Sequence, residues 1–175
     1  MRIRPTTNAD IPAIMAIFEH GRQVQRATGN LNQWVDGHPR QALIEQDIEQ
    51  GASYVCVVDE ETVQQKPVEL ETVIATFAAI EGEDPTYLQI EGGAWLNDAP
   101  YVTIHRISTN GAVKGAGQLC MEWVLERYDN VRIDTHHLNQ PMIHVVEKFG
   151  FKYCGVIYIA DGTARNAYHY VKELS

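Results

Sequence analysis

The 175-residue sequence predicts an α/β domain whose mixed, mostly antiparallel sheet carries helices on both faces. Three observations predict this fold class. Apolar residues recur at helical spacing in four segments, runs rich in β-branched residues lie between them, and the turn DGTAR joins two closing strands. Because this length fits one domain, we expect residues 1–175 to form a single unit.

The first half of the chain is predicted to hold a strand, two helices and a hairpin. After the strand-like RIRPTT, Thr7 or Asn8 is a good N-cap for a helix over about 8–20. A loop rich in Gly, Asn and Gln then carries Trp34, and a second helix is expected from Pro39. The runs SYVCVVD and VELETVIATFAAI indicate two antiparallel strands, and we interpret EETVQQKP between them as a hairpin connection.

The second half alternates strands and helices. A turn-rich segment over 81–100 leads to the strand YVTIHRIST, which runs directly into the glycine-rich NGAVKGAGQ. The helix expected from Gln118 is apolar on much of its circumference. The alternating strand VRIDTHH follows, and Asn139 and Pro141 are start signals for a helix that Gly150 ends. FKYCGVIYIA and NAYHYVKEL are the two closing strands.

Composition and charge exclude several classes of protein. With 45% hydrophobic residues the chain should fold, and its net charge of -9 with only 14 scattered Lys and Arg argues against a nucleic-acid binder. No apolar run approaches the roughly 18 residues of a membrane span, and no signal-peptide core is visible. We therefore expect a cytoplasmic protein without a membrane partner. The three cysteines show no metal-ligand spacing, so we expect no metal and no disulfide framework.

The glycine turn is a candidate anion site. A strand, a glycine turn and a helix together expose backbone N–H groups, and the positive end of the helix dipole favours an anion there. Gly115 and Gly117 would let a diphosphate approach the backbone closely. No Lys-Ser or Lys-Thr follows the last glycine and no GxGxxG is complete, which argues against ATP hydrolysis and NAD binding. Taken alone, the turn fits packing glycines equally well.

AVKGAG, the preceding strand and the later HHLNQPMIHVVEKFGF together resemble the GNAT superfamily of acyl-CoA-dependent N-acetyltransferases. The signature of that family is a strand, then Gln or Arg, two residues, Gly, any residue, and Gly or Ala, opening a helix. Its later Asn-containing helix ends in Gly-Phe. The order of elements matches over nearly the whole chain, and IHRIST, RIDTH and NQPM resemble a bacterial subgroup with few assigned substrates.

This resemblance implies a GNAT-like fold that uses acetyl-CoA as acyl donor. The main chain of Ile107 and Ser108 would pair with the pantetheine arm like an added strand. The glycine turn would wrap the pyrophosphate, Asn139 would bind the pantetheine or the loop, and Met142 would line the thiol end; Asn139 could instead be only a helix N-cap and Met142 only core. The implied cofactor-binding residues are Ile107, Ser108, Ala112, Val113, Lys114, Gly115, Ala116, Gly117, Gln118, Asn139 and Met142.

Two positions depart from the family pattern. Ala112 stands where Gln or Arg is usual, so phosphate binding would rest on backbone amides, with Lys114 as the nearest point charge. Val146 stands where many members carry the tyrosine proposed to protonate the departing thiolate. These departures motivate an alternative, a non-catalytic acyl-CoA-binding or regulatory module on the same fold.

Acetyl transfer to an amine requires a base, because a lysine-like amine has a pKa of about 10.4 and must lose a proton first. The base candidates are His105, on the strand before the glycine turn, and Asp134 and His136, which alternate on one face of the next predicted strand. Asp134 and His136 could instead form a hydrogen-bonded structural pair. For the acid we predict Tyr158 or its neighbour on that strand, Tyr153, with a solvent proton as the alternative.

The sequence says less about the amine that accepts the acetyl group than about the acetyl donor. We expect an N-acetyltransferase that acts on a primary amine of a small molecule or peptide. Trp34, Tyr87 and Trp95 are candidates for the walls of its acceptor pocket, although two or more of them could simply fill the core. The excess of 23 acidic over 14 basic residues suits a cationic acceptor, although a solvated acidic surface explains it equally well. Among oligomeric states, the resemblance favours a homodimer.

Overall fold

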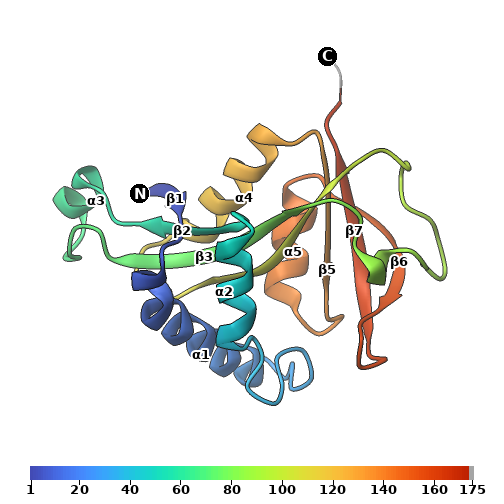
Figure 1. The fold of residues 1–175 in the computed structure, drawn as a ribbon, viewed down its shortest axis with the longest axis horizontal. Coiled ribbons are helices and arrows are strands. Elements are labelled where there is room, and N and C mark those ends of the chain that lie inside the picture. The colour runs from blue at the N-terminus through green and yellow to red at the C-terminus, as the bar shows by residue number, and fades with distance from the viewer. Residues whose placement is uncertain (174–175) are drawn as a thin grey trace.

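A seven-stranded sheet organises the chain in the computed structural model, which describes residues 1–173 (Figure 1). The strand order is β1-β2-β3-β4-β5-β7-β6. Every neighbouring pair is antiparallel except β4 and β5, which are parallel, so the predicted mixed, mostly antiparallel sheet is confirmed. The strands are β1 (Arg2–Pro5), β2 (Ser53–Val57), β3 (Val73–Glu81), β4 (Val102–Thr109), β5 (Asn130–Thr135), β6 (Lys152–Tyr158) and β7 (Ala164–Val171).

Helices cover both faces of this sheet, as Figure 1 shows for α1 and α4 on opposite sides of β3. Alternation along β2 explains why: Val55 and Val57 pack against Phe18 on one face, whereas Cys56 packs on the other face beside Cys120. All these side chains are buried. The helices are η1 (Asn8–Asp10), α1 (Ile11–Ala27), α2 (Gln41–Glu49), α3 (Glu60–Gln65), η2 (Pro85–Tyr87), α4 (Ala116–Arg127) and α5 (Gln140–Lys148).

Several boundaries differ from the sequence-based expectation: α2 begins at Gln41 and not at Pro39, and β3 begins at Val73 and not at residue 68. The predicted hairpin connection EETVQQKP forms α3, because the Asp59 carboxylate accepts a hydrogen bond from the Thr62 N–H and caps a helical turn. The first helix continues past Gly21 to Ala27. Gly21 allows close packing there, since a Cβ on it would lie 2.8 Å from Ser108 Oγ. Gly21 therefore brings α1 against β4.

Residues 82–101, here called the strap, cross from β3 to β4 over the β6–β7 end of the sheet. Its backbone forms a bridge between Glu91 and Val156, next to an irregularity in β6. A Cβ added to Gly93 would lie 2.0 Å from the Cys154 carbonyl oxygen. The strap is thus fastened to β6 by backbone contacts that leave no room for a side chain.

Gly93→Ala is expected to destabilise the fold by more than about 2 kcal/mol, because backbone, not a flexible side chain, must shift to admit the methyl group. Its neighbour provides a matched control. Gly92 has φ of 71°, and a Cβ there meets nothing within 4 Å, so Gly92→Ala should cost only about 1 kcal/mol of backbone strain. Urea unfolding of both variants measures the difference, and an equal loss would show that the strap is not held at Gly93.

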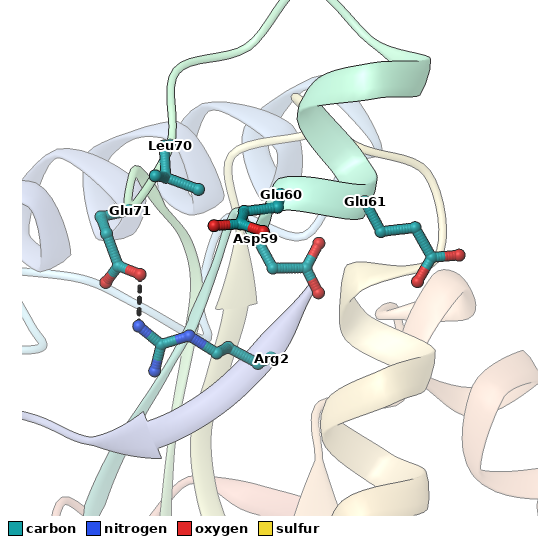
Figure 2. Close-up of a pocket in the computed structure, with 6 residues that line it drawn as sticks. All are labelled: Arg2, Asp59, Glu60, Glu61, Leu70 and Glu71. Atoms are coloured by element: carbon teal, nitrogen blue, oxygen red, sulfur yellow. Dashed lines mark hydrogen bonds and ion pairs between the residues drawn. The ribbon is translucent and has the colours of Figure 1, made fainter.

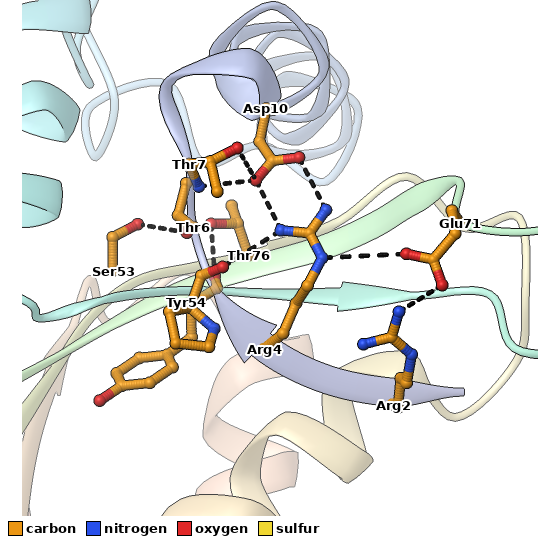
Figure 3. A network of polar contacts seen from close by, with 10 residues as sticks. Arg2, Arg4, Thr6, Thr7, Asp10, Ser53, Tyr54, Glu71 and Thr76 are labelled. Atoms are coloured by element: carbon orange, nitrogen blue, oxygen red, sulfur yellow. Dashed lines mark hydrogen bonds and ion pairs between the residues drawn. The ribbon is translucent and has the colours of Figure 1, made fainter.

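A polar network joins β1 to the start of η1 (Figure 3). The Arg4 guanidinium donates to both carboxylate oxygens of Asp10, at 2.8 and 2.9 Å, and the Thr7 N–H donates to the same carboxylate at 2.8 Å. The hydrogen bond from Arg4 outweighs the effect of burial and lowers the pKa of Asp10. Asp10 is buried, so its charge depends on these partners.

Asp10→Asn is expected to lower the free energy of unfolding at pH 7 by about 1–3 kcal/mol. Because the carboxyl pKa is lowered in the folded state, this contribution is present above the unfolded pKa of about 3.9 and disappears as pH falls through the folded value. Unfolding curves from pH 7 to 2 should therefore converge for variant and wild type. Glu71→Gln, which touches the same network at a half-exposed pair with Arg2, should cost less than about 1 kcal/mol.

Candidate functional site

The parallel strands β4 and β5 separate after a short contact. In the described chain they pair only at Val102–Val131 and Thr103–Arg132. Beyond these pairs a cleft of about 690 Å³ opens, lined by the later residues of both strands. The inner edge of β4 therefore presents N–H and C=O groups to a gap and not to another strand. Other walls come from the α1–α2 loop, the strap and the β6–β7 hairpin.

A β-bulge shapes the β4 side of this cleft. Thr76 pairs with Ser108 and Ala78 with His105, so two residues of β4, Arg106 and Ile107, lie opposite one residue of β3. Arg106 has φ of 54°, a left-handed conformation that is strained for a residue with a side chain. The bulge and its left-handed residue lie directly beside the cleft.

A buried ion pair anchors this bulge. The Arg106 Nη2–H donates to Asp47 Oδ2 at 2.6 Å, and Nε–H donates to the same oxygen at 3.1 Å. Asp47 lies on α2 and is buried. The second helix therefore holds β4 in the shape that separates it from β5.

His105 is hydrogen-bonded to an aspartate of the strap. Its Nε2 lies 2.9 Å from Asp84 Oδ2, and both residues line the cleft. Burial alone would raise the pKa of Asp84, but hydrogen bonds from His105 and Thr86 outweigh it and bring that pKa to about 2. Since Asp84 is ionised at neutral pH, it accepts the proton on Nε2 and leaves Nδ1 as the basic nitrogen. This arrangement suits a general base.

Asp134 lines the same cleft from β5. Its Oδ2 accepts a hydrogen bond of 2.6 Å from the hydroxyl of Tyr87 in η2. Burial and the nearby Asp134 charge raise the pKa of Tyr87 well above its usual range, so the phenol stays protonated. Tyr87 thus supports Asp134 from within the strap, with its hydroxyl directed at the carboxylate.

The other two predicted acid–base residues lie outside the cleft. β5 ends at Thr135, so His136 does not continue the strand beyond Asp134 as expected, and its Nδ1 accepts from the Leu138 N–H at 3.1 Å. No hydrogen bond joins it to Asp134 in the described part of the chain. Tyr158 is exposed on β6, where its hydroxyl donates to Glu91 at 2.9 Å and the Glu91 carboxylate raises the phenol pKa.

Of the three aromatic residues predicted to wall the acceptor pocket, only Trp34 belongs to the lining of the cleft. It packs edge-on against Phe18, with ring centroids 5.4 Å apart. Trp95 lies behind Tyr87, where its indole N–H donates to the Tyr87 carbonyl oxygen and its ring stacks on the Arg132 guanidinium. Trp95 is therefore packed within the strap and does not face the cleft.

The glycine turn opens α4 as the sequence indicated, although the helix begins at Ala116, two residues before the expected start. Gly115 is the N-cap, with φ of 90°, and a Cβ on Gly115 or Gly117 would meet nothing within 4 Å. The space above the turn is therefore open. The Ala112 N–H is already bonded to Asn110 Oδ1 at 3.0 Å, which leaves the amides from Val113 onward for an anion.

Asn139 and Met142 both line the cleft. The Asn139 side chain caps α5 by accepting from the Met142 N–H at 3.3 Å, as the N-cap alternative predicted. Its amide also donates to Gln33 Oε1 at 3.1 Å and so ties the α1–α2 loop to the start of α5.

Three polar residues of the cleft were not predicted from the sequence, namely Gln33, Asp84 and Arg165. The Asp-Pro-Thr run at 84–86 indicates a cap, but nothing in it indicates contact with His105.

A second hollow, of about 370 Å³, lies at the β1 side of the sheet (Figure 2). Arg2 is paired with Glu71 there, and the remaining side chains are mostly acidic. It contains none of the candidate residues. Within residues 1–173, no cluster of His, Cys, Asp or Glu is arranged to hold a metal ion, and no helix has the length and apolarity needed to cross a membrane.

Comparisons with known proteins bear on what this site does. No protein-family model matches the chain, and no curated protein sequence does. Two solved structures share the fold at low identity. One is a ribosomal-protein-alanine N-acetyltransferase from Brucella melitensis, with 16% identity, coverage of 98% of this chain and 99% of that one, and TM-score 0.59. The other is the NatC complex bound to a Gag peptide and CoA, with 11% identity, 98% of both chains and TM-score 0.61.

A third structure is much more similar. It is a GNAT-family acetyltransferase from Streptococcus agalactiae, with 31% identity over 99% of this chain and 96% of that one, and TM-score 0.84. Identity at this level along nearly the whole of both chains, together with the same fold, shows the family. The chain therefore belongs to the GNAT family of acetyltransferases and is an acyltransferase.

Proposed function

We propose that this protein transfers an acetyl group from acetyl-CoA to a primary amine of a small molecule or a peptide. The observation that carries the proposal is the cleft between β4 and β5, which places His105, bonded to Asp84, and Asp134 along one opening. An unpaired strand edge can bind an extended arm, and two ionisable groups beside it can move a proton.

The residues present fit acetyl-CoA. Open space above Gly115 and Gly117, the N-terminus of α4 and the lack of acidic side chains over 110–118 suit a diphosphate. The edge of β4 at Ile107 and Ser108 would hold the pantetheine arm, and Met142 would lie beside its thiol end. The cofactor supplies a thioester, whose acetyl group is activated toward an amine.

The side chains of the cleft would prepare the amine. Asp134 attracts the ammonium form, and His105 Nδ1 accepts its proton while Asp84 stabilises the resulting imidazolium. A backbone N–H at the bulge would donate to the thioester oxygen as that oxygen gains charge. No Tyr, Lys or Cys of the described residues lines the cleft, so we propose that the thiolate takes its proton from solvent.

Two measurements test this function. Calorimetric titration should show acetyl-CoA binding in the micromolar range, and a panel of primary amines should release free thiol from acetyl-CoA between pH 6 and 9. Absence of binding below millimolar concentration would contradict the cofactor assignment. Binding without turnover of any amine would contradict the transfer and favour an acyl-CoA-binding module.

A further inference from the structure

Arg165 is a buried cation without a carboxylate partner. It lies on β7, lines the cleft and is only 3% exposed. Its guanidinium donates to Thr163 Oγ1 at 3.1 Å and to the carbonyl oxygens of Ala164 and Gln33 at 2.9 and 3.3 Å. Across residues 1–173, no carboxylate oxygen lies within the 4.0 Å of an ion pair with it.

Neutral acceptors leave this charge incompletely compensated. Buried charges in proteins are normally paired, because the loss of hydration is costly. Arg106, which also lines the cleft, follows this rule and is paired with Asp47. Arg132 is buried without a carboxylate, but it lies outside the cleft lining and stacks on Trp95 and Tyr101. Burial lowers the pKa of Arg165, and the more distant charges of Asp134 and Asp161 offset this only in part. Among the described residues Arg165 has neither a carboxylate partner nor an aromatic ring over its guanidinium, so its charge can be compensated by an anion in the cleft.

The register of the sheet places this cation on the same face as Asp134 and the proposed base, His105. Thr103 is paired with Arg132, so His105 and Asp134 lie on one face of the sheet. Asp134 is paired with Ala167, which puts Arg165 on that face as well. Asp134 and Arg165 are diagonal neighbours on adjacent strands, a relation with Cβ atoms about 7–8 Å apart. A carboxylate and a guanidinium at this spacing can bind the two ends of a small zwitterion.

We propose that the acceptor is a small amine that also carries an anionic group, with its ammonium at Asp134 and His105 and its anion at Arg165. The inference rests on the proposed function and names the substrate class for the same cleft. The phosphates of CoA are assigned to the glycine turn, and no residue of 110–118 lines the cleft, so these phosphates do not account for Arg165.

The other charged groups of the cleft leave this position open for an anion. Asp84 is bonded to His105, and Asp161 accepts hydrogen bonds from the N–H and hydroxyl of Thr163 at 2.9 and 2.6 Å. Asp36, His38 and Arg40 lie on the α1–α2 loop, where the Arg40 guanidinium donates to the Asp36 carbonyl oxygen. The Gln33 carbonyl that meets Arg165 belongs to the same loop, so the loop and β7 jointly hold the guanidinium.

The test compares amines that differ only in the anionic group. An α-amino acid is paired with its carboxamide, and O-phosphoethanolamine with ethanolamine, at saturating acetyl-CoA. The anionic member of at least one pair should have a kcat/KM about 10- to 100-fold higher, as expected for a lost charge-assisted hydrogen bond. The pair that shows the preference identifies the anion as carboxylate or phosphate. Equal or better turnover of both neutral members would overturn the proposal and leave the proposed function intact.

Variants and a binding measurement complete the test. In Arg165→Gln the preference should fall to within about 3-fold while the KM for acetyl-CoA is unchanged. Arg2→Gln, which removes the same charge at the far side of the sheet, should keep the preference. A preference that survives Arg165→Gln would contradict the assignment. Because Arg165 is buried, wild-type protein saturated with CoA is also titrated with the N-acetylated form of each member of the pair that shows the preference, and only the anionic one should bind. If no amine is acetylated at all, the proposed function itself fails.

Discussion

Replacing His105 by Gln is expected to lower kcat about 10²- to 10⁴-fold, the usual contribution of a general base. Glutamine keeps a polar side chain of similar size but cannot take the proton from the ammonium group. Asp84 cannot substitute for it, because its pKa of about 2 makes it far too weak a base near neutral pH. The KM for acetyl-CoA should change little, since His105 acts on the acceptor.

The measurement is kcat across pH 6 to 9 by thiol release. The variant should lose most of its rate at the low end of this range, because an amine with a pKa of about 10.4 is then almost wholly protonated and no base removes its proton. Asp84 remains ionised over the whole range, so it adds no titration of its own. His136→Gln is the matched control, because His136 lies outside the cleft and should leave the profile unchanged. An unaltered profile in His105→Gln would remove this residue as the base.

Gly115→Glu is expected to weaken acetyl-CoA binding at least about 100-fold. The N-cap of α4 has φ of 90°, where a side chain strains the backbone by about 1–2 kcal/mol, and the added carboxylate would repel a diphosphate. Lys114→Gln should weaken binding less than about 5-fold, because an exposed point charge contributes little beside several backbone amides. Calorimetric titration with CoA measures both.

A second glycine separates strain from repulsion. Gly51 has φ of 68°, and a Cβ there also meets nothing within 4 Å, yet it lies in the turn between α2 and β2. Gly51→Glu adds the same charge and comparable strain away from α4, so CoA affinity should be retained. If Gly115→Glu binds CoA as well as Gly51→Glu does, the pyrophosphate is held elsewhere.

The sequence predicted the sheet and most helices because their signals are local. Hydrophobic periodicity and turn residues identified β4, the glycine turn and α4, and Asn139 was correctly anticipated as an N-cap. His105 and Asp134 were chosen from their strands and do face one cleft. The resemblance supplied the family, which the structural comparison then confirmed.

What the sequence missed depends on contacts between distant segments. Asp84 lies 21 residues before His105, within a turn-rich segment whose path across the sheet has no periodic signal. The bulge at Arg106 depends on Asp47, which is 59 residues away on α2. His136 was placed on the strand because alternation continued past Thr135, whereas the chain leaves the strand there to begin the turn before α5.

A crystal structure with CoA would locate the cofactor relative to the cleft. We predict the pantetheine arm in the gap between β4 and β5, paired with the main chain at Ile107 and Ser108, its thiol facing the cleft that holds His105. The diphosphate should lie on the amides that follow Val113. CoA bound anywhere else, or a gap closed by further pairing of β4 with β5, would contradict it.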